Sequence, residues 1–178
     1  MADHRAEEVL SFWFGQDAKR WFEKNATFDA EIRSRFLPLY EQLSANTDWL
    51  SQPRDCLARI VVLDQFPRNM FRGTPRAFAA DPLALAAAKH AVGSGFDRDL
   101  QLVEKQFIYL PFEHSESLAD QERACQLMKA LNEDLYDWAI RHKRIIERFG
   151  RFPHRNEILG RKSTPEEIEF LKQPGSGF

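Results

Sequence analysis

Arginine residues gather in two stretches of the chain that repeat one order of motifs. The first Phe-Pro stretch spans residues 63–75, and the second Phe-Pro stretch spans residues 149–165. In each, a Phe-Pro pair is followed by a basic residue, an asparagine, a further arginine and then a Thr-Pro pair. A guanidinium matches a carboxylate or phosphate with two parallel hydrogen bonds, and a helix that starts at Thr-Pro offers free N–H groups to an anion. These residue types and this spacing indicate a site for a small anionic ligand.

We expect arginines from both stretches to hold this anion. The predicted ligand-binding residues are Arg68, Arg72, Arg151, Arg155 and Arg161. The alternative is that these guanidinium groups pair with acidic side chains of the same chain and fix the loops, because structural ion-pair networks imitate ligand sites. The acidic residues that suit this alternative are Asp64, Glu113, Glu116 and Asp120. The sequence leaves both interpretations open.

Residues 109–116 add groups that can transfer a proton. His114 is the candidate general base, and a neighbouring carboxylate would orient its ring. The predicted catalytic residues are His114, Glu113, Glu116 and Asp64. His142 lies on an apolar helical stripe, and we expect it to be a hydrogen-bonded core residue.

The same residues show no recognisable spacing of metal ligands. His114 and Glu116 stand two positions apart, which places their side chains on different sides of a helix, unlike the histidine pair of a zinc helix. No metal ligand is therefore predicted, and the cofactor stays unknown. A metal-dependent hydrolase is kept as a third hypothesis for the site.

Charge is distributed unevenly along the 178 residues. The formal net charge is −2, yet five arginines and two aspartates give residues 54–76 a charge of +3. Residues 141–162 carry six arginines and two lysines against two glutamates, which is +6. A protein that binds nucleic acid over a broad surface usually has a basic domain, whereas the pI here is about 6.2. We therefore expect a local anion site and no nucleic-acid partner.

Composition indicates a globular protein. Hydrophobic residues make up 43% of the chain, but no apolar run approaches the length of a membrane span. Residues 1–8 lack the basic and then apolar order of a signal peptide. Cys56 and Cys125 each fall in an amphipathic pattern, which is typical of small core residues in a reducing compartment. We expect a cytoplasmic protein without a membrane partner, and the oligomeric state stays unknown.

Apolar residues recur at helical spacing along nearly the whole chain, which predicts about eight or nine helices with short connections. Prolines mark the expected boundaries: Pro67 and Pro111 should end their helices, whereas residues 164–167 form a capping box that starts one. Alanines at 84–91 are typical of close packing between helices. The pattern predicts an all-α fold of antiparallel helix pairs in a single domain, residues 1–178.

Four ordered motifs lie at residues 12–15, 63–69, 110–116 and 148–161, so together they cover nearly the whole chain. They resemble the motifs of a bacterial family of uncharacterised proteins, domain of unknown function 924. The family implies an all-α fold similar to the tetratricopeptide-type α/α superhelix. It brings no established reaction.

Two functions are consistent with these observations. In the first, the chain binds a small anionic molecule through the arginines, as a binding protein or as an enzyme, while the acidic residues and His114 orient them or transfer protons. In the second, a tetratricopeptide-like helical scaffold binds an acidic peptide or protein partner in its concave face. A closed pocket lined by the arginines would favour the first function, and an open groove with exposed aromatic side chains would favour the second.

Overall fold

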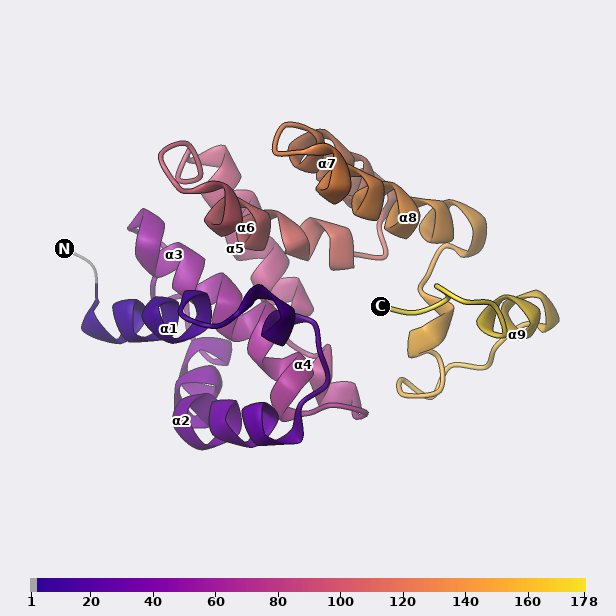
Figure 1. Ribbon diagram of the computed structural model, residues 1–178, viewed down its shortest axis with the longest axis horizontal. Helices are drawn as coiled ribbons and strands as arrows, with labels where there is room; N and C mark the ends of the chain where they lie inside the picture. Colours follow the sequence, from indigo (N-terminus) through magenta and orange to yellow (C-terminus); the bar gives the residue numbers. More distant parts are fainter. Residues whose placement is uncertain (1–2) are drawn as a thin grey trace. The chain divides into compact units, whose positions relative to one another are not determined.

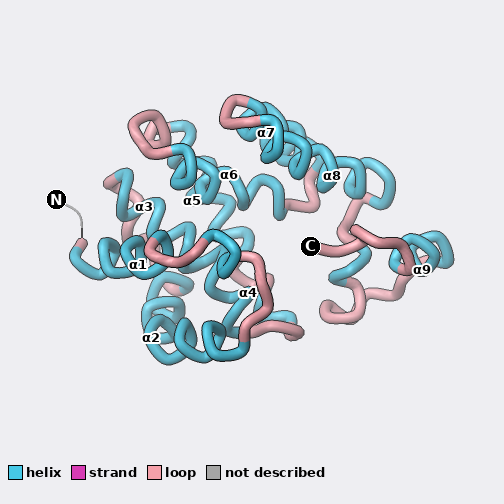
Figure 2. The backbone as a smooth tube through the Cα atoms, in the orientation of Figure 1, coloured by secondary structure: helices cyan, strands magenta, loops and turns pink. Residues whose placement is uncertain are grey.

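The computed structural model describes residues 3–178, which form helices joined by turns and loops (Figures 1 and 2). No strand occurs within this range, so the predicted all-α class is confirmed. None of the described helices has the length and apolarity needed to cross a membrane. Packing divides the chain into two compact units, one of residues up to Arg72 with Arg76–Pro111, and one of Gly73–Pro75 with Phe112–Phe178. The single domain over residues 1–178 stays a prediction.

Helices of the first unit pack around a cluster of aromatic rings. The helical elements are α1 (His4–Phe14), η1 (Ala18–Trp21), α2 (Ala26–Ser44), α3 (Pro53–Ile60), η2 (Val61–Gln65), α4 (Phe66–Met70), α5 (Asp81–Gly93) and most of α6 (Leu102–His114), and a short turn, η3 (Pro75–Ala77), precedes α5. α1 packs against α3, α2 against α4, and α3 against α5. Trp13 is fully buried and its ring contacts those of Phe28, Phe66 and Phe107. Aromatic packing therefore joins α1, α2, α4 and α6.

One helical run crosses the first Phe-Pro pair. α3, the π-helical segment η2 and α4 follow one another without a break from Pro53 to Met70. The prediction that Pro67 ends this helix is wrong. A proline in a helix lacks an N–H and its ring crowds the carbonyl four residues back. The π segment widens the turn just before Pro67, and there the Phe66 N–H donates to the Val61 carbonyl, five residues back.

Two further helices continue through a proline. Pro38 lies inside α2, and Pro111 lies inside α6, which ends three residues later at His114. The prediction that Pro111 limits its helix is therefore wrong as well. Leu110 and Phe112, the neighbours of Pro111, are both buried. Burial of these large side chains offsets the hydrogen bond that the proline removes, because tertiary packing overrides local propensity.

The second unit is built on an antiparallel helix pair. Its elements are the end of α6, α7 (Leu118–Lys129), α8 (Glu133–Phe149), η4 (Pro153–Arg155) and α9 (Pro165–Leu171). α7 and α8 pack side by side and are joined by a short turn at residues 130–132 (Figure 1). Ile145 and Ile146 of α8 form a core with Phe152, against which Phe149 and Phe170 pack.

Local signals set the ends of these helices. The Asn132 side chain accepts the Leu135 N–H at 2.9 Å and so starts α8. Gly150 ends α8 with a φ of 71°, a left-handed conformation that favours glycine. The predicted capping box at α9 is confirmed, because the side chains of Thr164 and Glu167 each accept the other's backbone N–H.

Candidate functional site

Arg68, from the first Phe-Pro stretch, binds a carboxylate of its own unit. Its two Nη atoms donate to the two carboxylate oxygens of Asp81 at 2.9 and 3.0 Å. Arg68 Nη1 also lies 3.7 Å from the carboxylate of Asp64. Asp64 is fully buried on η2 and accepts a 2.6 Å hydrogen bond from Gln65. Here Asp64, a predicted catalytic residue, serves as a buried counter-ion.

Arg72 forms a two-pronged ion pair in the same unit. Its Nε and Nη2 atoms each lie 2.9 Å from a carboxylate oxygen of Asp29, in the first turn of α2. Asp29 also accepts from the Asn69 side chain at 2.8 Å. These bonds raise the pKa of Arg72. Because this edge of the guanidinium is filled by a carboxylate, the pair fastens the end of α4 to α2.

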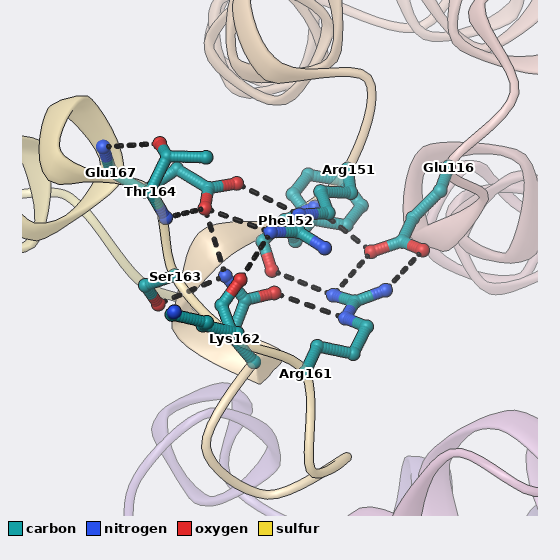
Figure 3. Close-up of polar contacts among 9 residues, drawn as sticks. Glu116, Arg151, Phe152, Arg161, Lys162, Ser163, Thr164 and Glu167 are labelled. Carbon is teal, nitrogen blue, oxygen red and sulfur yellow. Dashed lines mark hydrogen bonds and ion pairs between the residues drawn. The ribbon is translucent and has the colours of Figure 1, made fainter.

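In the second unit, Arg161 is bound on several sides (Figure 3). Its guanidinium donates to both oxygens of Glu116, at 2.8 and 2.9 Å, to Asn156 Oδ1 at 2.9 Å and to the Phe152 carbonyl at 3.0 Å. Glu116 also accepts the Phe152 N–H at 2.8 Å. Burial raises the pKa of Glu116, but the bonds from Arg161 and Phe152 outweigh it, so this pKa is lowered. Most of the five N–H donors of Arg161 are therefore in use.

Arg151 is held in the same way by Glu167 (Figure 3). Its Nε and Nη2 atoms donate to the two carboxylate oxygens of Glu167, each at 2.8 Å, and Nη2 also donates to the Lys162 carbonyl at 2.8 Å. The Thr164 N–H adds a 2.8 Å bond to Glu167, which is only 2% exposed. The Arg151 bonds lower the pKa of Glu167 to about 2. Together these contacts close the loop between α8 and the start of α9.

Arg155 and His114 meet through the backbone. Arg155 lies in η4, is buried, and donates from Nη2 to the carbonyl oxygen of His114 at 3.1 Å. Its guanidinium lies 4.6 Å from the centre of the Phe152 ring. His114 is half-buried and is the last residue of α6. The contact therefore ties the end of α6 to η4.

Glu113 is paired with His142 of α8. Glu113 Oε1 lies 3.0 Å from His142 Nδ1, and the Trp138 carbonyl oxygen lies 2.8 Å from the same nitrogen. The side chains of Glu113 and His142 are 4% and 8% exposed. Two oxygen atoms beside Nδ1 favour a proton there, so neutral His142 keeps its lone pair on Nε2. Within residues 3–178, no hydrogen-bond partner faces Nε2.

A shallow hollow of about 540 Å³ lies in the first unit, and its lining residues are Asp3, Arg5, Thr47, Asp48, Trp49, Leu50 and Ser51. None of the five predicted ligand-binding arginines lines it. Within residues 3–178, no three His, Cys, Asp or Glu side chains gather as metal ligands.

Comparison with known proteins agrees with the motifs. The family described as "Bacterial protein of unknown function (DUF924)" matches residues 9–175. The chain belongs to this family. A solved structure of a protein of unknown function from Agrobacterium tumefaciens is similar to it, with a TM-score of 0.88 and 41% sequence identity over 94% of this chain and 97% of that one. No curated protein matches.

For this DUF924 chain, the sequence pointed to one member of the Glu113–His142 pair as a site residue but not to the other. Glu113 was predicted as a catalytic residue, but the histidine of the predicted site was His114, and His142 was assigned to the core. His142 is indeed buried and hydrogen-bonded. A histidine on a buried stripe needs a polar partner, so the sequence could have predicted that His142 contacts a polar group. Which carboxylate supplies it depends on how α6 meets α8, and local spacing does not encode that.

Proposed function

We propose that the second unit carries an acid–base site for a small anionic molecule, centred on Glu113 and His142. The observation that supports it is the position of His142 Nδ1 between Glu113 Oε1, at 3.0 Å, and the Trp138 carbonyl, at 2.8 Å. Nε2 is then the nitrogen that exchanges a proton with a substrate. Glu113 fixes the ring and stabilises the imidazolium that forms, as a buried carboxylate does for an oriented catalytic histidine.

An exposed arginine on the same turn of α8 as His142 supports an anionic substrate. Arg141 precedes His142 on α8, and its Cζ atom lies 4.8 Å from the centre of the Trp138 ring. Within the described chain, no carboxylate pairs with Arg141 or with Arg144, one turn further along. Four of the loop arginines, by contrast, face carboxylates of their own unit. The anion contact is therefore assigned to Arg141, and the pairs of Arg68, Arg72, Arg151 and Arg161 fix the loops.

The test begins with binding. Wild-type protein is screened by thermal shift against phosphates, nucleotides and carboxylates, because a ligand that prefers the folded state raises the melting temperature. At least one anion should stabilise the wild type and Arg123→Gln, an exposed control on α7, and should stabilise Arg141→Gln less. If no anion stabilises the wild type, or if Arg141→Gln responds as the control does, the proposal fails.

Turnover of the stabilising compound is measured next. Glu113→Gln and His142→Gln should each lower kcat by about 100-fold or more, the usual contribution of a positioned acid or base. His90→Gln, on α5 of the first unit, is the matched control and should keep wild-type kcat. Circular dichroism melts show whether each variant remains folded during the assay. Equal kcat in His142→Gln and His90→Gln would contradict the acid–base role.

The surface of α8 favours a second candidate function, a helical scaffold for an acidic peptide or protein partner. Trp138 is 48% exposed, and Arg141 and Arg144 lie on the following turn. Tryptophan and arginine are the residue types that most often dominate protein interfaces. An acidic peptide that binds wild type and His142→Gln equally, but binds Arg144→Gln weakly, would favour the scaffold over the acid–base site.

A further inference from the structure

The ring of Phe178 rests in a set of aromatic side chains above His142. The two rings stack face to face, with centroids 3.7 Å apart and planes 17° apart. Trp138, Phe152 and His154 meet the edges or faces of the Phe178 ring at 6.3, 6.2 and 5.8 Å, each nearly perpendicular to it. We name the four residues around Phe178 the aromatic cradle: Trp138, His142, Phe152 and His154.

The segment that carries Phe178 follows this surface closely. Ser176 Oγ donates to the Leu171 carbonyl at 3.2 Å, which brings the chain back from α9. At Gly177, a Cβ atom would lie 3.3 Å from His154 Cβ, so a small residue suits this passage. Phe178 itself is 50% exposed. An aromatic pair of this kind changes an equilibrium constant by only about twofold to tenfold, so another ring can compete for the place.

The cradle selects for an aromatic ring rather than for an aliphatic group. Face-to-face stacking on His142 and edge contacts with three more rings are the arrangements in which π systems attract one another. A ring in that place lies against the imidazole of the Glu113–His142 pair. Arg141 lies one residue along α8 and has no carboxylate partner within residues 3–178. One turn of α8 therefore offers both an imidazole on which an aromatic ring can stack and a guanidinium that can bind a negatively charged group.

We propose that the aromatic cradle binds the ring of an aryl carboxylate or aryl phosphate in the place that Phe178 occupies, with Arg141 facing its negative group. This inference rests on the proposed acid–base function and names its substrate class. Phe178 then competes with the ligand for the aromatic cradle. The apparent affinity for the ligand is the intrinsic affinity multiplied by the fraction of molecules in which Phe178 has left the cradle.

The experiment uses full-length protein labelled with ¹⁵N-histidine. Benzoate and phenyl phosphate are titrated, with acetate and inorganic phosphate as matched anions that lack a ring. The aromatic probes should shift the imidazole signals of His142 and His154, and should leave His4 and His90 unchanged. The non-aromatic anions should shift the two cradle histidines much less at the same concentration.

Three exposed-residue variants then test the assignment. Phe178→Ala should lower the Kd of benzoate by about twofold to tenfold, because the competing ring is gone. Arg141→Gln should raise this Kd by about twofold to fivefold, the range of an exposed charge pair. Arg123→Gln should leave it unchanged.

Several results would overturn the proposal. The first is equal shifts of the His142 and His154 signals with acetate and with benzoate. The second is a Kd of benzoate that is unchanged or raised in Phe178→Ala. The third is a dimer in gel filtration that Phe178→Ala abolishes, since the cradle would then hold a ring of a second copy. His142→Phe separates this inference from the acid–base function, because it keeps a ring but removes the proton carrier. Benzoate should still shift His154 in this variant. If it does not, while His142→Gln still lowers turnover, only the aryl substrate class is wrong.

Discussion

Glu113 Oε1 and His142 Nδ1 lie 3.0 Å apart in a pair whose side chains are 4% and 8% exposed. The contact joins the last turn of α6 to the middle of α8 in the second unit. A buried carboxylate is costly without a partner, so each member of the pair stabilises the placement of the other. The pair therefore holds α6 against α8 and is also the centre of the proposed site. Variants must distinguish its effect on stability from its effect on activity.

Truncation of Glu113 should destabilise the protein more than its neutral replacement does. Glu113→Ala leaves buried His142 without its carboxylate and should lower the free energy of unfolding by about 1–3 kcal/mol. Glu113→Gln should cost less, because the amide oxygen still accepts a hydrogen bond. Urea denaturation measures the stability of both variants, with Glu122→Ala, at an exposed position of α7, as the control. A double-mutant cycle with His142→Ala should show coupling, and additive effects would contradict a direct interaction.

Glu167 should make stability depend on pH in a defined window. Its pKa is lowered from 4.5 to about 2, chiefly by the hydrogen bonds from Arg151. A carboxyl group with a lowered folded-state pKa stabilises the fold above its unfolded pKa, and this contribution is lost as pH falls through the folded pKa. The melting temperature of Glu167→Gln should therefore lie below that of wild type at pH 6, by about 4–8 °C. The difference should shrink from pH 4.5 downward.

Glu166→Gln supplies the matched control for this pH effect. Glu166 lies next to Glu167 on α9 and pairs with Arg148, but its side chain is 62% exposed. Exposed ion pairs contribute little, so this variant should melt within about 1–2 °C of wild type at every pH. A gap between wild type and Glu167→Gln that stayed constant from pH 6 to pH 2.5 would show that charge on Glu167 is not the cause.

Local sequence signals were sufficient for the fold class and for several helix ends. Helical periodicity gave the all-α class, and the Thr164-to-Glu167 capping box was correct because its hydrogen bonds form within one turn. The predictions that helices end at Pro67 and Pro111 were wrong, because the continuation of these helices depends on contacts outside the local sequence. Both helices continue because a π turn or burial of neighbouring side chains offsets the cost of the proline. Such compensation comes from tertiary packing, which a proline rule omits.

The partners of the arginines could not be predicted from spacing. Arg72 binds Asp29, which lies 43 positions earlier, and Arg161 binds Glu116, 45 positions earlier. The sequence showed that the guanidinium groups were concentrated, and both an anion site and an internal ion-pair network remained open. Only the distances between helices show that carboxylates face Arg72 and Arg161. For the same reason, spacing could not single out Arg141, which has no carboxylate partner within residues 3–178, from the other arginines of the basic segment.

The two cysteines should differ in reactivity. Both are free, and Cys56 is buried with its thiol 3.6 Å from the Ala87 carbonyl oxygen. Burial raises the pKa of Cys56 to about 12, and burial also raises the pKa of half-buried Cys125. Because the thiolate is the reactive form, a disulfide reagent at pH 8 should label Cys125 slowly and Cys56 only on unfolding. Cys125→Ala should then show no labelling in the native state, whereas fast labelling of that variant would contradict the burial of Cys56.

Arg59 should stabilise the loop between α2 and α3. Arg59 is 3% exposed, and its guanidinium donates to the carbonyl oxygens of Asp48, at 2.9 Å, and Asn46, at 2.8 Å. Burial lowers the pKa of Arg59. Trp49, in the same loop, has a φ of 67°, which is strained for a residue other than glycine and requires support from its surroundings.

Arg59→Met should therefore lower the free energy of unfolding by about 2–4 kcal/mol, because two carbonyl oxygens lose the hydrogen bonds that they accept from a charged donor. The cost stays below the sum of both bonds, since methionine also removes the penalty of burying a charge. Urea denaturation measures the change, and Trp49 fluorescence should shift to longer wavelength as the loop relaxes. Arg33→Met, which removes one bond to the Met70 carbonyl, is the control and should cost about half as much. If Arg59→Met matched the wild type in stability and in Trp49 emission, the loop would be held by its other contacts.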